Sequence, residues 1–323
     1  MKQIKIGLLG MGNIGTGTYK TLEMNRARIS ANTGLDLVIT KILEKDLARE
    51  RDVTVTPEQF TQEPADILEA PDIDIVIELL GGIEPATGFM LTAMHNGKHV
   101  VTANKAAVAA NYDRLMGAAR ANRVLFRFEA SVGGGIPILN ALTSPLLANE
   151  YEEIRGILNG TTNYILTMMA ERGMSYEDAL KSAQAQGFAE ADPTADVEGH
   201  DVANKLSILI SLAFGKRVPP GDIPTAGITG ITMRDIEKAA ADGGKLKLIA
   251  LAKKAGDDLE YGVKPTFVAN DHPLAGVNNE FNAIFVKGNA VGELMFYGKG
   301  AGPLPTGSAV MGDVIEIARA ISL

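Results

Sequence analysis

The stretch that decides the fold lies at the start of the chain, where residues 4–15 read IKIGLLGMGNIG. Its apolar first half is typical of a buried strand, and a helical pattern follows from Thr16 to about Arg28. Between strand and helix, Gly10 permits a tight turn, Gly12 lets backbone amides approach a pyrophosphate, and Gly15 lets helix and strand pack closely. The stretch therefore predicts a turn that binds a dinucleotide.

The same alternation of strand and helix continues through the first 130 residues. Strands are expected over residues 35–43, 73–80, 99–102 and 124–129, and helices over residues 85–96 and 106–122. Repeated strand–helix units of this kind form parallel sheets. We therefore expect an α/β fold in which residues 1–130 form a Rossmann-type doubly wound parallel sheet, the dinucleotide-binding domain.

The pattern changes after a glycine-rich break at residues 133–135. Helices are expected around residues 138–147, 161–172, 175–186 and 198–214, and strands near residues 152–158, 259–268, 281–287 and 292–298. These segments predict a second, α+β domain over residues 131–303. A C-terminal helix at about residues 304–323 is expected to return to the first domain.

Composition excludes several classes of protein. Of the 323 residues 46% are hydrophobic, and no run approaches the roughly 18 apolar residues of a membrane helix, so no membrane role is expected. No signal peptide is visible, which favours a cytoplasmic location. The formal net charge is −8 without a dense basic block, which disfavours nucleic acid as a partner.

The chain has no cysteine, which excludes disulfides, thiolate zinc sites, iron–sulfur clusters and a catalytic thioester. Only four histidines occur, and although His95 and His99 have helical spacing, His99 falls where a strand begins. A metal site on this pair is therefore not expected. No tyrosine is followed four residues later by lysine, so a lysine or a histidine is the expected proton donor.

The residue that meets the adenosine ribose is expected directly after the second strand. Glu44 favours the free 2′-hydroxyl of NAD, whereas Lys45, Arg49 and Arg51 favour the 2′-phosphate of NADP. The two signals conflict, and the choice of coenzyme stays open.

The densest polar cluster precedes an apolar helix that opens with Asp201 and Lys205, four residues apart and so on one helix face. Partial burial would lower the pKa of Lys205 toward the range useful for proton transfer. The alternative is a solvated ion pair. Lys105 follows a parallel strand at the edge where ligands bind, or is an exposed lysine at a helix start. Glu129 beside the glycine-rich turn suits a hard cation, or belongs to a structural turn.

Together these segments resemble homoserine dehydrogenase over nearly the whole chain. The match runs through the glycine turn, the segment TANK ending at Lys105, EASVGGGIP from Glu129, LNGTTNYI from Leu158, the cluster from Glu190 to Lys205, and the segment GAG ending at Gly302 that precedes GDVI from Gly312. The resemblance implies the reversible reduction of L-aspartate 4-semialdehyde to L-homoserine with NADPH or NADH, on the route to threonine and methionine. It also implies a homodimer formed through the second domain.

The resemblance further implies roles for particular residues. Lys205 would be the acid/base and Lys105 would lie close to cofactor and substrate, while Glu190, Asp196 and Asp201 would form the substrate pocket. The side chain of Glu129 would hold a sodium-type cation with main-chain carbonyls. The implied carbonyl ligands are Val132, Gly134 and Ile136, and the implied cofactor-binding residues are Gly10, Gly12, Asn13, Ile14, Gly15, Lys45, Thr102, Lys105 and Gly302.

The chain departs from the family pattern in two places. Glu44-Lys45 stands where many members have an apolar residue and Arg, and the chain stops at Leu323, where many bacterial members continue into a regulatory ACT domain. Feedback through such a domain is not expected. Two other hypotheses stay open: an NAD(P)-binding sensor, and a dehydrogenase of another small hydroxy acid that uses His200.

Overall fold

The computed structural model describes residues 1–322 and divides the chain into two compact units. The first unit comprises Met1–Gly135 together with the chain from Ala301 on, and the second comprises Ile136–Gly300.

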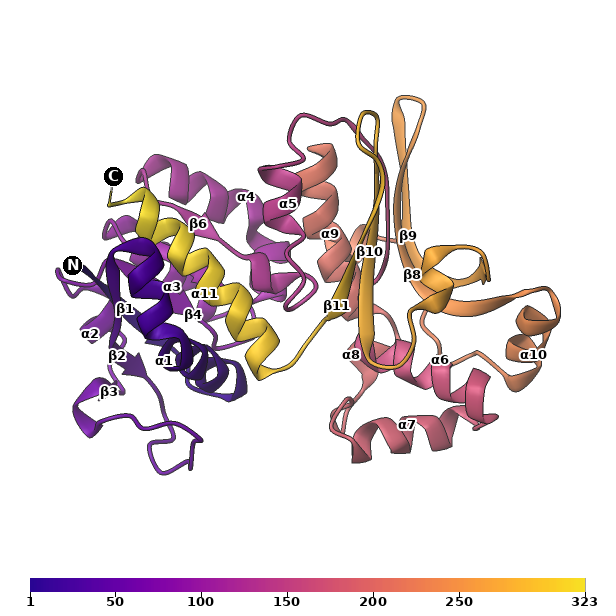
Figure 1. Ribbon diagram of the computed structural model, residues 1–323, viewed down its shortest axis with the longest axis horizontal. Helices are drawn as coiled ribbons and strands as arrows, with labels where there is room; N and C mark the ends of the chain where they lie inside the picture. Colours follow the sequence, from indigo (N-terminus) through magenta and orange to yellow (C-terminus); the bar gives the residue numbers. More distant parts are fainter. Residues whose placement is uncertain (323) are drawn as a thin grey trace. The chain divides into compact units, whose positions relative to one another are not determined.

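The first unit is built on a parallel sheet of six strands in the order β3-β2-β1-β4-β5-β6 (Figure 1). The strands are β1 (Lys2–Leu9), β2 (Leu35–Leu43), β3 (Phe60–Thr61), β4 (Ile75–Glu78), β5 (His99–Thr102) and β6 (Phe126–Arg127). Parallel neighbours need crossover connections, which here place helices beside the sheet. The order reverses between β1 and β4, which confirms the predicted Rossmann-type doubly wound sheet.

Helices of the first unit bury the apolar strands. They are α1 (Asn13–Thr33), α2 (Ala65–Leu68), α3 (Ala86–His95), α4 (Lys105–Ala121) and α11 (Pro303–Ala320). Helix α11 lies against α1 although the two are nearly 300 residues apart in sequence (Figure 1). Val314 and Ile317 of α11 join Ile6 and Ile77 of the sheet in one buried cluster, so the end of the chain completes the core of the first unit.

The second unit has an antiparallel sheet of five strands in the order β11-β10-β7-β8-β9. The strands are β7 (Tyr151–Ile157), β8 (Gly244–Ala255), β9 (Asp258–Ala269), β10 (Phe281–Gly288) and β11 (Gly292–Lys299). The helices are α5 (Leu139–Thr143), α6 (Gly160–Arg172), α7 (Tyr176–Ala185), α8 (Thr194–Val197), α9 (His200–Phe214) and α10 (Met233–Ala241). Helix α9, which carries Asp201 and Lys205, contacts both β7 and β8, and α6 contacts β8. This unit confirms the predicted α+β class.

Several elements differ from the sequence-based expectation. Strand β8 was not expected from the sequence, since its residues GKLKLIALAKKA are rich in good helix formers and only pairing with β7 and β9 overrides that propensity. The strand expected over residues 124–129 is only Phe126–Arg127, since the chain turns into a 3₁₀ helix, Glu129–Ser131. The helix expected over residues 138–147 ends at Thr143.

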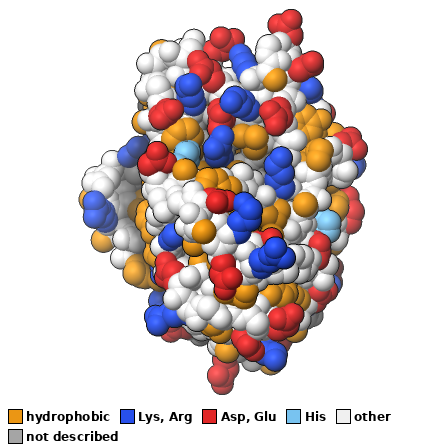
Figure 2. All heavy atoms as spheres, turned by 90° about the vertical axis from the view of Figure 1, so that its right-hand side faces the viewer, with side chains coloured by type: hydrophobic (Ala, Val, Ile, Leu, Met, Phe, Trp, Pro, Cys, Tyr) orange, Lys and Arg blue, Asp and Glu red, His pale blue; other side chains and the backbone are white. Residues whose placement is uncertain are grey.

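Surface and helix character fit the composition. No helix among residues 1–322 is long and apolar enough to cross a bilayer. On the face that Figure 2 shows, basic side chains are interspersed with acidic and hydrophobic ones. His99 does begin a strand, where its Nδ1 accepts a hydrogen bond from the backbone N–H of Leu125 at 2.9 Å.

The crossing of α1 and α11 generates the first prediction. A Cβ on Gly307 would lie 2.7–2.8 Å from backbone atoms of Gly17 and Thr18, whereas one on Gly312 of the same helix would meet nothing within 4 Å. We expect Gly307→Ala to lower the free energy of unfolding by about 1–3 kcal/mol because the two backbones must separate. Gly312→Ala should raise it by about 0.5–1 kcal/mol. Urea unfolding of both variants is the measurement, and equal effects would contradict the close crossing.

Candidate active site

The glycine turn leaves the start of α1 open. A Cβ on Gly15 would lie 2.2 Å from the carbonyl oxygen of Gly10, so only glycine allows helix and strand to approach this closely. A Cβ on Gly12 would meet nothing within 4 Å, and no side chain caps the helix at Gly12. The first backbone N–H groups of α1 therefore suit an anion, and the residues present fit the pyrophosphate of a dinucleotide.

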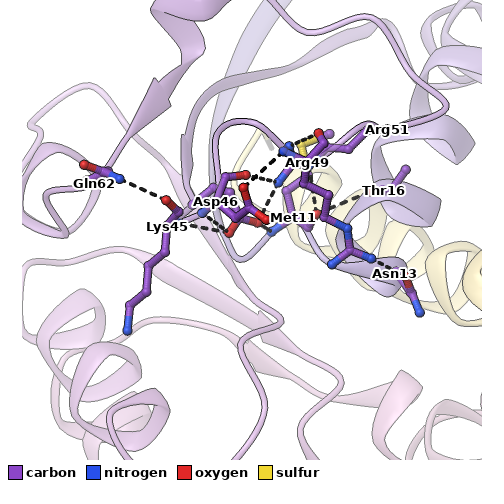
Figure 3. Close-up of polar contacts among 9 residues, drawn as sticks. Met11, Asn13, Thr16, Lys45, Asp46, Arg49, Arg51 and Gln62 are labelled. Atoms are coloured by element: carbon purple, nitrogen blue, oxygen red, sulfur yellow. Dashed lines mark hydrogen bonds and ion pairs between the residues drawn. The ribbon is translucent and has the colours of Figure 1, made fainter.

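Charged residues from the loop after β2 lie beside this turn (Figure 3). The carboxylate of Glu44 accepts a hydrogen bond from the backbone N–H of Met11 at 3.1 Å, inside the glycine motif. Arg49 donates to Oδ1 of Asn13, the first residue of α1, at 2.7 Å. The structure thus brings Glu44 and Arg49, one from each of the two sets that the sequence offered for coenzyme choice, to the start of α1.

A buried carboxylate stands at the ends of β4 and β5. Thr102 Oγ1 donates to Glu78 Oε2 at 2.6 Å, and the backbone N–H of Leu80 donates to Glu78 Oε1 at 2.8 Å. Thr102 Oγ1 also accepts from the backbone N–H of Asn104 at 2.9 Å, and Asn104 caps the helix that begins at Lys105. Glu78 therefore fixes the turn that presents Lys105.

Glu78 was not expected at the site, because it stands inside the apolar run IVIELL. An acid in a strand expected to be buried on both faces was the signal that could have found it. Burial raises the pKa of Glu78 above its usual value, although the bonds from Thr102 and Leu80 oppose that shift.

Glu129 lies in a 3₁₀ turn and is itself buried. Its backbone N–H donates to Oδ2 of Asp313 on α11 at 2.9 Å, and burial raises the pKa of Asp313 to about 8. Among residues 1–322 no group of three or more His, Asp or Glu side chains could hold a metal ion. A cation here would therefore depend on main-chain carbonyls besides the carboxylate, the donor set of a monovalent ion rather than of zinc.

The second unit holds a buried lysine between two helices. Lys205 is 8% exposed, and its Nζ donates to Asp201 Oδ2 at 2.6 Å and to the carbonyl oxygen of Leu158 at 2.7 Å. Asp201 and Lys205 lie one turn apart on α9, while Leu158 lies in the turn between β7 and α6. The Asp201–Lys205 pair is thus buried, and the alternative that it is a solvated ion pair is wrong.

Asn159 connects this pair to a second carboxylate. Its Nδ2 donates to Asp196 Oδ1 at 2.6 Å and to Asp201 Oδ2 at 3.0 Å, while its Oδ1 caps α6 by accepting from the N–H of Thr162. Burial and the charge of Asp201 raise the pKa of Asp196, and the bond from Asn159 opposes this. Sequence reasoning did not assign Asn159 to the site, although the Asn-Gly-Thr turn after a strand is a helix-capping signal.

Two residues named from the sequence stand apart from the buried cluster. The side chain of Glu190 is exposed, and in the part of the chain that the structure describes no hydrogen bond joins its carboxylate to the cluster. Its segment is tied to the site through Thr161, which donates to the carbonyl oxygen of Phe188 at 2.6 Å. His200 is exposed at the start of α9.

A parallel sheet with an open glycine turn and a second unit with a buried Lys–Asp pair define the class of NAD-binding oxidoreductases. A family model described as the NAD binding domain of homoserine dehydrogenase matches residues 10–129, and one described as homoserine dehydrogenase matches residues 137–315. The chain belongs to the homoserine dehydrogenase family, as the sequence predicted.

Individual relatives agree. A homoserine dehydrogenase of Bacillus subtilis is 43% identical over 323 residues, which are 100% of this chain and 75% of the relative. The crystal structure of a homoserine dehydrogenase from Thiobacillus denitrificans matches with a TM-score of 0.96 at 42% identity, over 100% of this chain and 74% of that chain. A hyperthermophilic archaeal homoserine dehydrogenase in complex with NADPH matches with a TM-score of 0.81 at 26% identity, over 98% of both chains.

The buried acid at the end of β4 gives a pH prediction. The pKa of Glu78 is raised in the folded state, so the folded protein holds a proton that the unfolded chain releases, and the contribution of Glu78 to stability falls as the pH rises above about 4.5. Glu78→Gln removes this loss: its amide oxygen can accept from the backbone N–H of Leu80, and its amide N–H can donate to Oγ1 of Thr102, which is the donor to Glu78 in wild type. We expect the variant to be more stable than wild type at pH 7 and equally stable below pH ~4.5. Urea unfolding across this range measures it, and a constant difference would refute it.

Proposed function

We propose that the protein catalyses the reversible reduction of L-aspartate 4-semialdehyde to L-homoserine with NADPH or NADH, in the biosynthesis of threonine and methionine. The buried Lys205–Asp201 pair carries the proposal, because it offers a desolvated proton donor in a chain of this family. The NADPH complex of the archaeal relative supports the use of NADP or NAD. A cytoplasmic location follows from this role in metabolism.

Lys205 acts as the acid/base. When a nicotinamide coenzyme is bound it supplies the hydride that reduces the aldehyde carbon. Nζ of Lys205 gives its proton to the substrate oxygen and takes it back in the reverse direction. Asp201 and the carbonyl of Leu158 fix the direction of Nζ, which reduces the reorganisation needed at the moment of transfer.

Substrate binding involves the carboxylates around this lysine. Asp201 and Glu190 attract the ammonium group of the amino acid, and Asp196 supports the pocket through Asn159. Lys105, presented by the Glu78–Thr102–Asn104 turn, lies close to coenzyme and substrate. The side chain of Glu190 is exposed, so a ligand can reach its carboxylate.

The coenzyme-binding residues come from the carboxyl edge of the parallel sheet, the edge where ligands bind in such folds. The start of α1 takes the pyrophosphate, and Gly302 at the start of α11 approaches the coenzyme with a backbone φ of +115° that favours glycine. The full proposed set is Gly10, Gly12, Asn13, Ile14, Gly15, Lys45, Thr102, Lys105 and Gly302.

Sodium and a second copy of the chain are the proposed further components. The carboxylate of Glu129 and the carbonyls of Val132, Gly134 and Ile136 hold Na⁺, and turnover in buffers with Na⁺ replaced by a bulky organic cation tests this.

The edge strand β11 exposes Met295 (40%) and Tyr297 (53%), which supports a homodimer through the second unit. Sedimentation velocity tests the dimer.

The role of Lys205 yields a quantitative prediction. We expect Lys205→Ala to lower kcat by about 10²–10⁴ because a general acid contributes on this scale. NADPH binding and the circular dichroism spectrum should stay unchanged. His200→Gln is the matched control on the same helix and should keep wild-type turnover, whereas its loss would favour a histidine-dependent dehydrogenase.

The reaction itself is tested by following reduced nicotinamide while the purified protein oxidises L-homoserine with NAD or NADP. Turnover that depends on Lys205 supports the proposal. Tight coenzyme binding without turnover would instead favour an NAD(P) sensor.

A further inference from the structure

The loop after β2 carries three basic and four acidic residues, and their hydrogen bonds decide which of them can meet a ligand. The loop runs from Glu44 to Asp52 beside the glycine turn (Figure 3). On sequence alone Glu44 favours a free ribose, and the basic residues favour a 2′-phosphate. The donors and acceptors that are already engaged within the protein decide between binding of a free ribose and binding of a 2′-phosphate.

The carboxylate of Glu44 is saturated. Oε1 accepts from the backbone N–H groups of Lys45 at 2.8 Å and Asp46 at 3.1 Å. Oε2 accepts from the backbone N–H of Met11 at 3.1 Å and pairs with Nη2 of Arg51 at 3.1 Å. An ionised carboxylate has about four acceptor sites, so the hydroxyls of a ribose would have to displace bonds that already exist.

The pKa of Glu44 agrees with this picture. Burial acts to raise it, but the backbone N–H groups of Asp46, Met11 and Lys45 and the guanidinium of Arg51 outweigh burial and hold the pKa below its usual value. Glu44 is therefore charged, and its charge is already bound by backbone N–H groups and by Arg51 of the protein itself.

Arg51 is also committed to the fold. Its side chain is only 5% exposed, and it donates from Nε to the carbonyl oxygen of Met11, from Nη1 to that of Arg49 and from Nη2 to that of Asp46. The guanidinium lies 5.4 Å from the ring centre of Phe60. Arg51 thus cancels the charge of Glu44, and the two together connect the loop to the glycine turn.

Arg49 is placed differently. Its side chain is exposed, and its guanidinium donates to Oδ1 of Asn13 at the start of α1. Its own backbone N–H is held by Asp46 Oδ1 at 3.1 Å, which fixes where the side chain leaves the loop. Arg49 and Asn13 both line a cavity of about 280 Å³ beside the first turn of α1. A guanidinium has five N–H donors, so it can keep Asn13 and still bind a phosphate.

Lys45 extends in another direction. In Figure 3 its ammonium points away from Asn13 and Arg49. Between the two exposed basic residues of the loop, Arg49 is therefore the one directed at the glycine turn.

We propose that this chain prefers a nicotinamide dinucleotide with a 2′-phosphate, that Arg49 is the residue that binds this phosphate, and that Glu44 is a positioning residue rather than a ribose ligand. The proposal rests on the proposed use of NADP or NAD, and it replaces Lys45 of the coenzyme-binding set given above by Arg49 as the phosphate ligand. An acid at the end of β2 usually indicates a preference for NAD. Here Glu44 instead holds the glycine turn in place.

The test is the dissociation constant of NADPH and of NADH, measured by calorimetry on the full chain. Wild type should bind NADPH more tightly. Arg49→Gln should raise the dissociation constant of NADPH about tenfold or more, since one charge-assisted bond is lost, and should change that of NADH little. Arg28→Gln, which removes an exposed arginine at the far part of α1, should leave both constants unchanged.

Glu44→Gln separates positioning from ribose binding. If Glu44 is a positioning residue, Glu44→Gln should weaken the binding of both coenzymes by the same factor, so that the ratio of their dissociation constants stays constant. Selective loss of NADH in this variant, or selective loss of NADPH in Lys45→Gln but not in Arg49→Gln, would overturn the proposal. So would an unchanged ratio in Arg49→Gln.

Homoserine turnover measured on the same variants keeps the two proposals apart. Coenzyme binding that follows these expectations without turnover would sink the enzymatic proposal alone. Turnover with a coenzyme ratio that ignores Arg49 would sink only the assignment of Arg49.

Discussion

Burial of the Lys205 ammonium group constrains how α9 and the turn after β7 meet in the second unit. Removing a lysine charge from water costs several kcal/mol unless partners compensate it, and Lys205 finds Asp201 and the carbonyl of Leu158. Those partners come from α9 and from the turn after β7, so the sheet and both helices must be in place before the charge is stable. Asn159 extends the arrangement to Asp196 and at the same time caps α6. Asn159, which orients the carboxylate that holds the lysine, is therefore also the residue that begins α6.

The first unit uses the buried Glu78 and the half-buried Glu44 in a similar way at the carboxyl edge of its sheet. Glu78 accepts from Thr102 and from the backbone of Leu80, and Glu44 accepts from the backbone of Met11. Each acid ends a strand and binds N–H or O–H groups of a neighbouring loop, which limits the motion of loops that would otherwise be the least ordered part of the fold. The start of α1, by contrast, has no capping side chain and remains open to an anion.

Much of this architecture could be predicted from the sequence, because periodic apolar runs and the glycine turn depend on local properties. The parallel, doubly wound sheet of the first unit and the shared helix face of Asp201 and Lys205 belong to this part, whereas the short strand β3 was not expected from the sequence. Strand β8 could not be found in this way, since its residues favour a helix and only pairing with β7 and β9 makes it a strand. Glu78 was hidden in an apolar run, and the bridging role of Asn159 depends on carboxylates about 40 residues further along the chain.

Glu44 shows most clearly why a motif position does not by itself define a ligand. An acid after the second strand is compatible with two roles that share the same residue type and the same place in the fold. The difference lies in whether its oxygens are free, and that depends on Arg51, seven residues later, and on the direction of the Met11 N–H group. Because Arg51 neutralises Glu44, the repulsion that an acid at this position would exert on a phosphate is weakened. The selectivity of the site then depends on which exposed cation the loop directs toward α1, and Asp46 sets that direction by holding the backbone of Arg49.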